Sequence, residues 1–178
     1  IGITGAGGSL GKALTKKFRS HGHKIIGFTH NRKPPELVEE GPNEWVYWEC
    51  GKEFLLENSL SKIDILILNH GIYDYQQDLE KSIEINATSK IIILKLFEKI
   101  SLSQSIESSP KEIWINTSEA EILPALNPCY EISKSLIGQV VTFKRNFNNQ
   151  NKSRNLIIKK IILGPFKSDL NPIGVMSP

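Results

Sequence analysis

Apolar and polar residues alternate in blocks along this chain, with short, almost continuously apolar runs between longer segments of helical periodicity. The apolar runs predict six strands, at residues 1–4, 24–29, 45–50, 63–68, 113–116 and 156–163. Helices are predicted between them, at 12–20, 52–61, 77–100 and 130–147. Continuous apolar runs are typical of parallel strands buried on both faces. The pattern therefore predicts an α/β fold, a doubly wound parallel sheet with right-handed crossovers and helices on both faces.

The length of 178 residues fits one domain with a substantial core. No internal repeat or linker interrupts the alternation of strands and helices. Ile1 already resembles the inside of a strand, and the sequence stops at Pro178 just after a predicted strand end. We therefore expect a single domain over residues 1–178 that is truncated at both ends.

The composition limits the binding partners and the cellular compartment that we expect for this protein. The net charge of +3 comes from 22 basic and 19 acidic residues without a dense basic cluster, so a nucleic-acid partner is not expected. No apolar run approaches the roughly 20 residues that span a bilayer, so no membrane segment is expected. Cys50 and Cys129 lack the spacing of a zinc site or a redox pair. They indicate reduced thiols, a cytoplasmic location and no metal site.

A glycine-rich segment lies between the first predicted strand and the first helix. It comprises Thr4, Gly5, Gly7, Gly8, Ser9, Leu10 and Gly11, with Ala6 among them. Such a turn lets the backbone approach a pyrophosphate, which then lies on the helix N-terminus. The segment predicts a dinucleotide site; the alternative is a tight turn without a ligand.

The end of the second strand indicates which dinucleotide is bound. A carboxylate there would bind the ribose of NAD, whereas basic residues accommodate the 2′-phosphate of NADP. Here the strand is followed by Thr29, His30, Asn31 and Arg32, with no acid. Arg32 offers a planar fork for phosphate, so NADP(H) is favoured over NAD(H), and a solvated basic loop is the alternative.

Other candidate cofactor contacts lie where later strands end. Glu49 and Cys50 end the third strand, and Asn69, His70 and Gly71 follow the fourth. Ligands of open α/β sheets bind at such ends. His70 is interpreted as a loop histidine in preference to an acid–base group, because the sequence shows no partner for it.

Tyr130 and Lys134 stand four residues apart in the predicted last helix and therefore share a face. A phenol ionises near pH ~10, and a neighbouring ammonium favours the phenolate. We therefore expect Lys134 to lower the pKa of Tyr130, making it a proton donor and acceptor. The alternative is a chance pairing on a helix surface.

Two further polar residues stand out. Asn86 lies among isoleucines inside the predicted helix 77–100, where asparagine is a poor helix residue, so it indicates a kink or a polar task. Ser118 follows the fifth strand, and Gly164, Pro165, Phe166 and Ser168 follow the sixth.

These segments, in this order, resemble the short-chain dehydrogenase/reductase family. The segment 4–11 is similar to its cofactor loop, and 64–71 to its fourth strand and the signature that follows. The resemblance implies a catalytic tetrad of Asn86, Ser118, Tyr130 and Lys134. It also implies that Tyr130 and Lys134 contact the cofactor, and that the segment 163–168 lies beside the nicotinamide. The family's last strand and most of its substrate-binding segment are absent.

Two departures from the family pattern are visible. Ser9 replaces a glycine, so the spacing of Gly5, Gly8 and Gly11 resembles the longer, sugar-nucleotide-modifying branch of the superfamily. Ser118 precedes Tyr130 by twelve residues, one fewer than the family's usual interval. Thr117 would restore the interval, but the strand register favours Ser118.

The resemblance implies an NADP(H)-dependent oxidoreductase that interconverts a small-molecule carbonyl and alcohol. Tyr130 would transfer the proton, Lys134 would assist it and hold the nicotinamide ribose, Ser118 would bind the substrate oxygen, and Asn86 would hold a relay water. Two alternatives remain: a sugar-nucleotide epimerase or dehydratase of the extended type, and a non-catalytic nucleotide-binding domain of a larger chain. In the family, the helices carrying Asn86 and Tyr130 often form a homo-oligomer interface, and the apolar residues here are compatible with one.

Overall fold

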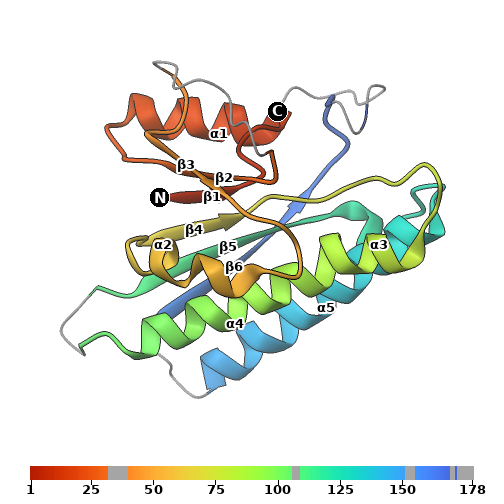
Figure 1. Cartoon of the computed structure of the whole chain (residues 1–178). Coiled ribbons are helices and arrows are strands. Elements are labelled where there is room, and N and C mark those ends of the chain that lie inside the picture. The colour runs from red at the N-terminus through yellow and green to blue at the C-terminus, as the bar shows by residue number, and fades with distance from the viewer. Residues whose placement is uncertain (32–39, 106–108, 151–154, 169–170, 172–178) are drawn as a thin grey trace.

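The computed structural model describes residues 1–31, 40–105, 109–150, 155–168 and 171. Strands and helices alternate along the chain (Figure 1). The strands are β1 (Gly2–Thr4), β2 (Ile26–Thr29), β3 (Glu44–Tyr47), β4 (Ile65–Leu68), β5 (Lys111–Ser118) and β6 (Leu156–Leu163). The helical elements are α1 (Ser9–Ser20), η1 (Glu53–Leu56), α2 (Glu57–Ser61), α3 (Leu79–Ile83), η2 (Glu84–Thr88), α4 (Ser89–Leu102), η3 (Glu119–Glu121) and α5 (Pro128–Gln150).

The strands form one six-stranded sheet in the order β3-β2-β1-β4-β5-β6, and every neighbouring pair is parallel. The chain runs outward from β1 in one direction and from β4 in the other. Ligands of open parallel sheets bind at such a switch point, outside the carboxyl ends of the strands. The predicted α/β class with a parallel sheet is confirmed.

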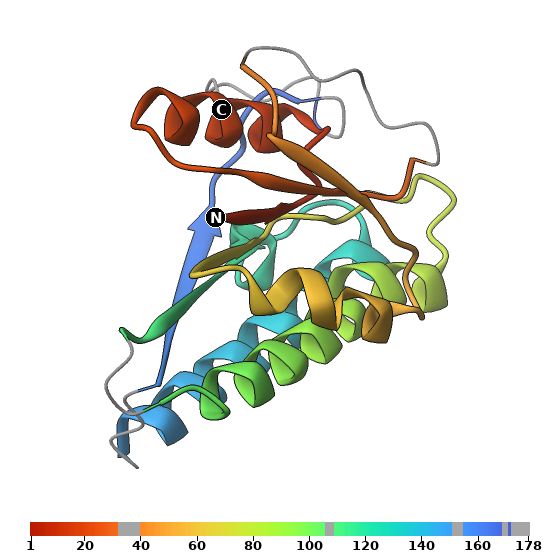
Figure 2. The same ribbon diagram turned by 60° about the vertical axis from the view of Figure 1, so that its left-hand side comes forward.

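Helices cover the two faces of the sheet. The sheet lies between α1 on one side and α2, α4 and α5 on the other, with α4 and α5 side by side (Figures 1 and 2). The smaller core lies under α1 and includes Ile3, Ile25 and Ile67. The larger core lies under α4 and α5, where Phe28 and Phe97 are fully buried. β4 contributes Leu66 and Leu68 to the larger core and Ile67 to the smaller one, which explains its uninterrupted apolar sequence.

The predicted boundaries need small corrections. β3 ends at Tyr47 instead of residue 50, because Tyr47 pairs with Thr29, the last residue of β2. The predicted helix 52–61 begins as the 3₁₀ turn η1. β5 extends to Ser118, because all eight of its residues pair with β6. The bounds predicted for β6 are confirmed.

The predicted helix 77–100 is interrupted. η2 (Glu84–Thr88) is a π-helical turn between α3 and α4, and Asn86 lies in it. π-turns insert one residue into a helix and occur frequently at functional sites. Asn86 therefore marks both a local change of helix type and a polar contact, described below.

No helix within the described residues is long and apolar enough to cross a membrane. The same residues contain no group of three or more histidine, cysteine or acidic side chains placed to hold a metal ion.

Candidate active site

A cavity of about 480 Å³ opens at the carboxyl ends of the strands. Its floor is polar and comes from the ends of β4 and β5 and the start of α5, where Asn69, Ser118, Tyr130 and Lys134 lie. Its other walls come from the segment after β6 and from the η3–α5 loop. Their residues are Gly164, Pro165, Phe166 and Ser168 in the first, and Leu123, Pro124, Ala125 and Leu126 in the second.

Tyr130 is held at the start of α5. Asn127 precedes the helix, and its side-chain oxygen accepts a hydrogen bond of 3.0 Å from the backbone N–H of Tyr130. Asparagine is a favoured helix cap, and proline is favoured at the first helical position, where Pro128 stands. The Asn127 side chain also donates to the carbonyl of Asp74, at 2.9 Å, which ties this helix end to the loop after β4.

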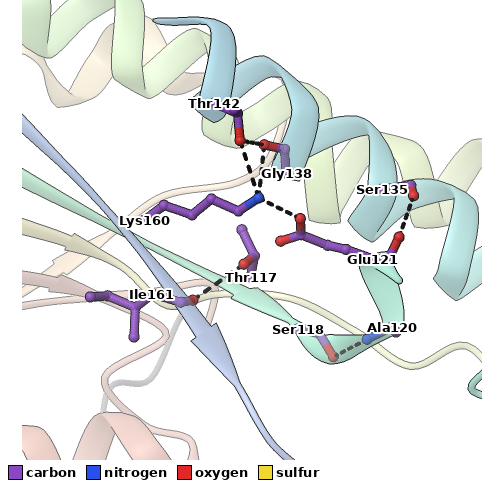
Figure 3. Close-up of polar contacts among 9 residues, drawn as sticks. All are labelled: Thr117, Ser118, Ala120, Glu121, Ser135, Gly138, Thr142, Lys160 and Ile161. Atoms are coloured by element: carbon purple, nitrogen blue, oxygen red, sulfur yellow. Dashed lines mark hydrogen bonds and ion pairs between the residues drawn. The ribbon is translucent and has the colours of Figure 1, made fainter. Parts of the chain in front are cut away.

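Ser118 and Tyr130 meet although they belong to different elements. The Ser118 side chain and the Tyr130 phenol line the same cavity, close enough for Ser118 to lower the Tyr130 pKa. The Ser118 Oγ accepts a hydrogen bond of 3.2 Å from the N–H of Ala120 (Figure 3). Thr117, the other hydroxyl considered from the sequence, is 2% exposed and donates to the carbonyl of Ile161, at 3.2 Å. Thr117 therefore faces β6, and the structure brings Ser118 to Tyr130.

The expectation that the Tyr130 pKa is lowered is wrong, because the structure raises it. Burial raises the pKa of Tyr130 above its ordinary value, the nearby Ser118 hydroxyl lowers it, and the neighbouring Tyr73 raises it further. The reason is geometric: the Lys134 ammonium lies 5.2 Å from the centroid of the Tyr130 ring, over the ring face. Desolvation of the phenolate outweighs the attraction of a charge placed over the ring.

The pKa of Lys134 is also shifted from its ordinary value. Its side chain is only 6% exposed, and burial lowers its pKa to about 8, against an upward pull from the Glu121 carboxylate. Gly71 makes room for the ammonium, since a Cβ on Gly71 would lie 3.2 Å from the Lys134 Nζ and 2.8 Å from the Asn86 Oδ1. Gly71 thus lets Lys134 and Asn86 approach the same point from two helices.

Asn86 is fully buried, and its side-chain amide is hydrogen-bonded within the protein. Its Oδ1 accepts a hydrogen bond of 2.8 Å from the N–H of Ile72. Its Nδ2 donates to the carbonyl of Ile72 and to the Ser133 Oγ, each at 3.0 Å. Both amide hydrogens are therefore used in holding the Gly71–Ile72 backbone and α5 in place. Any bond from this side chain to a relay water would have to use the remaining lone pair of its oxygen.

The glycine-rich segment fits a pyrophosphate. Gly5 has φ of 65°, a conformation that favours glycine, and a Cβ on Gly11 would lie 2.2 Å from the Gly5 carbonyl oxygen. Among the described residues, no heavy atom lies within 4 Å of a Cβ placed on Gly7. α1 has no side-chain cap and no acidic residue in its first turn. The N-terminus of this helix is thus open to an anion, which its backbone N–H groups and dipole favour.

Most of the cofactor contacts predicted at the ends of β2 and β3 fall on residues that the structure describes. The Thr29 Oγ1 accepts a bond of 3.1 Å from the N–H of Asn31, and His30 is exposed. Arg32, the expected phosphate ligand, lies outside the described residues. Glu49 forms an ion pair of 2.8 Å with Lys52, and the half-buried Cys50 packs against the larger core.

His70 has the partner that the sequence did not reveal. Its Nδ1 lies 2.8 Å from the Thr4 Oγ1, which also accepts from the backbone N–H groups of Asn69 and His70. Its ring packs edge-on against Trp48, and burial lowers its pKa well below the usual value. His70 thus joins the end of β4 to the end of β1, which agrees with its interpretation as a loop histidine.

Two residues near the site were not singled out from the sequence. Lys90 is 1% exposed, and its ammonium donates to the Asn116 carbonyl at 2.8 Å; the Asn116 side chain donates to the Asn69 Oδ1 at 2.9 Å. Burial and the charge of Lys134 lower the Lys90 pKa well below its usual value. The signal in the sequence was a single lysine before the apolar run Ile91–Leu94. Tyr73, whose ring lies 5.1 Å from that of Tyr130, carried no such signal.

Solved dehydrogenases share this architecture. Serine dehydrogenase from Escherichia coli superposes with a TM-score of 0.75 at 19% identity, over 93% of this chain and 82% of that one. A short-chain dehydrogenase from Burkholderia cenocepacia in complex with NADP superposes with a TM-score of 0.77 at 17% identity, over 96% and 74%. The fold is therefore the Rossmann fold of the short-chain dehydrogenases.

Sequence comparison specifies the family. A family model described as "NAD dependent epimerase/dehydratase family" matches residues 1–150. Monoglucosyldiacylglycerol epimerase from Synechocystis sp. is 38% identical over 184 residues, which cover 99% of this chain and 43% of that enzyme. The chain belongs to the NAD-dependent epimerase/dehydratase family, and it spans less than half the length of the curated relative that it matches. The resemblance to short-chain dehydrogenases noted from the sequence is confirmed.

Proposed function

We propose that this domain catalyses the reversible, NAD(P)-dependent oxidation of a secondary alcohol of a sugar, as the central step of an epimerisation. The observation that carries the proposal is the proximity of the Ser118 hydroxyl to the Tyr130 phenol, whose pKa it lowers, in a cavity that Lys134 also lines. A fixed hydroxyl beside a proton-transferring phenol is the arrangement that a carbinol or carbonyl oxygen requires. Bound NAD(P) would supply the hydride acceptor and donor.

The roles of the side chains follow from their protonation states. Burial keeps Tyr130 a neutral phenol, so it is ready to donate a proton to a carbonyl oxygen and must lose its own proton before it accepts one from an alcohol. The Ser118 hydroxyl stabilises the charge that develops on the substrate oxygen. Lys134, with a pKa of about 8, is charged near neutral pH and offsets negative charge on the phenol. Asn86 positions α5 through Ser133.

A dinucleotide would extend along the switch point of the sheet. The first turn of α1 and the Gly5–Gly11 segment would hold its pyrophosphate, and Gly164 and Pro165 would border its nicotinamide end. We further propose a preference for NADP(H), supported by the absence of a carboxylate in the sequence Thr29-His30-Asn31 that ends β2.

The rim of the cavity favours an amphiphilic substrate. Tyr75, Leu123 and Leu126 border the cavity, with exposed fractions of 70%, 53% and 91%. An exposed apolar cluster rimming a polar site is typical of a surface that binds an apolar group. The Synechocystis relative is named for a glycolipid. We therefore propose a lipid-linked hexose, with its sugar on the polar floor and its apolar part against these three side chains.

An isotope experiment on the full-length protein tests this function. The substrate is a glucosyl lipid carrying deuterium at the carbinol carbon that would be inverted. In an epimerisation, the deuterium leaves this carbon and returns to its opposite face, so the product retains the label and no net NAD(P)H forms. Loss of the label with accumulation of reduced nicotinamide would show a net dehydrogenase, and absence of both changes would contradict the proposal.

A net NADP(H)-dependent carbonyl reductase is the second candidate. It is favoured by the position of the Gly164–Pro165 segment in the cavity wall, which resembles the dehydrogenase branch. Stoichiometric consumption of NADPH with a panel of ketones and aldehydes, and no epimerised product, would support it over epimerisation.

A homo-oligomer is proposed through α5. Ile132, Leu136 and Phe143 on this helix have exposed fractions of 50%, 39% and 69%. Sedimentation of the full-length protein is expected to show a dimer or a larger assembly. A monomer at micromolar concentration would contradict this.

A further inference from the structure

A nearly inaccessible ion pair lies behind the catalytic floor, where Lys160 of β6 meets Glu121 of η3 (Figure 3). The ammonium nitrogen and the carboxylate Oε2 are 2.5 Å apart, and the side chains are 13% and 8% exposed. Buried charges are costly unless they are paired and hydrogen-bonded, so this pair is expected to have a function besides general stability.

The Lys160 ammonium has three hydrogens, and each is donated to an acceptor in the protein. One goes to Glu121, one to the carbonyl of Gly138 at 3.1 Å and one to the Thr142 Oγ1 at 3.2 Å. The last two acceptors belong to α5. A single ammonium therefore joins β6, η3 and α5, as Figure 3 shows.

Gly138 is required by this arrangement. A Cβ at this position would lie 2.0 Å from the Glu121 Oε2 and 2.6 Å from its Oε1. The carboxylate therefore occupies the space that any other side chain would need. Glycine weakens a helix interior, so its presence in the middle of α5 is explained by the close approach of Glu121.

Each joined element carries part of the proposed site. Glu121 comes three residues after Ser118, Gly138 comes one helical turn after Lys134, and β6 leads directly into Gly164. A second link lies beside the first: the Ser135 hydroxyl donates to the Glu121 carbonyl at 3.0 Å. The pair thus lies where three walls of the cavity converge.

The pair also acts on Lys134 through charge. The titratable groups that face Lys134 are Tyr130 on the same helix, Lys90 from α4, His70 after β4 and Glu121 from η3. Glu121 is the acidic group in this set, and it raises the Lys134 pKa against the effect of burial. Within the described part of the chain, the Glu121 Oε1 is buried without a hydrogen-bond partner. The Lys160 ammonium therefore contacts this carboxylate at Oε2 alone.

We propose that Glu121 and Lys160 are positioning residues for the active site. Their ion pair fixes η3, α5 and β6 relative to one another, and the Glu121 carboxylate supplies the negative charge that faces the Lys134 ammonium. This inference rests on the proposed function only in so far as Lys134 takes part in it. Neither residue touches the cavity where the substrate would bind; both act through Ser118, Tyr130 and Lys134.

The test is a direct titration of Lys134 in the full-length protein, followed by the ¹³Cε signal of labelled lysine and assigned by its loss in Lys134→Met. Glu121→Gln removes one charge at nearly constant shape and is expected to lower the Lys134 pKa. Glu98→Gln is the matched control, because Glu98 pairs with Lys144 at 2.7 Å between α4 and α5 but is not among the groups that act on Lys134. An unchanged pKa in Glu121→Gln, or an equal fall in Glu98→Gln, would overturn the proposal.

Glu121→Asp is the second variant, in case Glu121→Gln does not fold. It keeps the charge and is expected to keep the Lys134 pKa near that of the wild type. Its shorter side chain moves η3 relative to α5, so kcat should fall several-fold while KM changes little. Wild-type kcat in Glu121→Asp would contradict the positioning role. The titration needs no substrate, so failure of the proposed function in the wild type leaves it interpretable.

Discussion

The Lys134 ammonium lies over the ring face of Tyr130, 5.2 Å from its centroid, whereas Ser118 is the side chain that lowers the pKa of the Tyr130 hydroxyl. A cation over an aromatic face is attracted to the ring's electrons whether or not the hydroxyl is ionised. The direct control of the phenol's proton in the ligand-free protein therefore belongs to Ser118 and to burial. Lys134 contributes a charge whose own protonation varies near neutral pH.

Tyr130→Phe is expected to lower kcat/KM by about 10²–10⁴-fold, the usual contribution of a positioned general acid or base. Cofactor binding, measured by thermal shift, should persist because the ring remains. Tyr73→Phe is the matched control, since Tyr73 lies in the same cavity but its hydroxyl bonds to the Ala125 carbonyl at 3.4 Å. Equal losses in the two variants would remove Tyr130 from its proposed role.

NADPH is expected to raise the melting temperature of the wild type more than NADH at equal concentration. A ligand at about 100 times its dissociation constant stabilises the folded state by about 2.7 kcal/mol, so a difference in affinity appears directly as a difference in shift. Equal shifts, or a larger one with NADH, would contradict the NADP(H) assignment made from the sequence of residues 29–32.

Gly7→Ala separates cofactor binding from folding. The space around a Cβ at Gly7 is open in the ligand-free protein, so the melting temperature without cofactor should not change. The added methyl group would occupy space that the pyrophosphate needs, so the thermal shift with NADPH should become smaller. Gly11→Ala is the contrast, because its Cβ would clash with the Gly5 carbonyl and should lower stability even without cofactor. An unchanged NADPH shift in Gly7→Ala would place the pyrophosphate elsewhere.

Lys134→Met is expected to abolish turnover while stabilising the ligand-free fold. The Lys134 pKa falls from 10.5 to about 8 on folding, so the folded state binds this proton more weakly than the unfolded state does. The free energy of unfolding therefore rises with pH between about 8 and 10.5. Below about pH 8, the buried lysine lowers it by a constant amount relative to an uncharged side chain. The difference of about 2.5 pKa units corresponds to about 3 kcal/mol, which the variant should recover at neutral pH.

Urea denaturation at several pH values measures this effect. Lys95→Met, at an exposed position of α4, is the control and should leave the stability and its pH dependence unchanged. A Lys134→Met variant that is less stable than the wild type at neutral pH would show that the buried lysine is not a net cost to folding.

Leu126→Ser is expected to raise KM for a lipid-linked hexose several-fold and to leave KM for a water-soluble glycoside unchanged. Leu126 is 91% exposed, so its removal should not affect folding. Leu102→Ser is the control, because Leu102 is also an exposed leucine (62%) and lies at the far end of α4, outside the cavity lining. If Leu126→Ser changed KM equally for the lipid-linked hexose and the water-soluble glycoside, this would contradict an apolar subsite at the rim of the cavity.

The alternation of strands and helices along the chain and the location of the site follow from local pattern. Apolar runs predicted the strands, and the residues just after each run predicted which side chains meet at the carboxyl edge of the sheet. β6 was predicted with its observed bounds, because both ends of its apolar run are marked by polar or glycine residues. Asn86 was noticed for a physical reason, since an amide among isoleucines needs partners.

Long-range contacts explain what the sequence did not reveal. The partners of Asn86 lie 14 and 47 residues away, so the π-turn has no local signature. Glu121 and Lys160 are separated by 39 residues. The spacing of Tyr130 and Lys134 correctly indicated a shared helix face. It carried no information about desolvation, which decides the direction of the Tyr130 pKa.

The π-turn at η2 also sets the rotational phase of the helix that follows it. Each residue of an α-helix advances the chain by about 100°, so one residue more or fewer before α4 would turn all of its side chains by that angle. Lys90, Ile93 and Phe97 would then leave the sheet while the helix itself stayed intact. A single-residue deletion within Glu84–Thr88 would therefore change the packing of side chains along the whole of α4. The length of this short segment is as much a part of the site as the identity of Asn86.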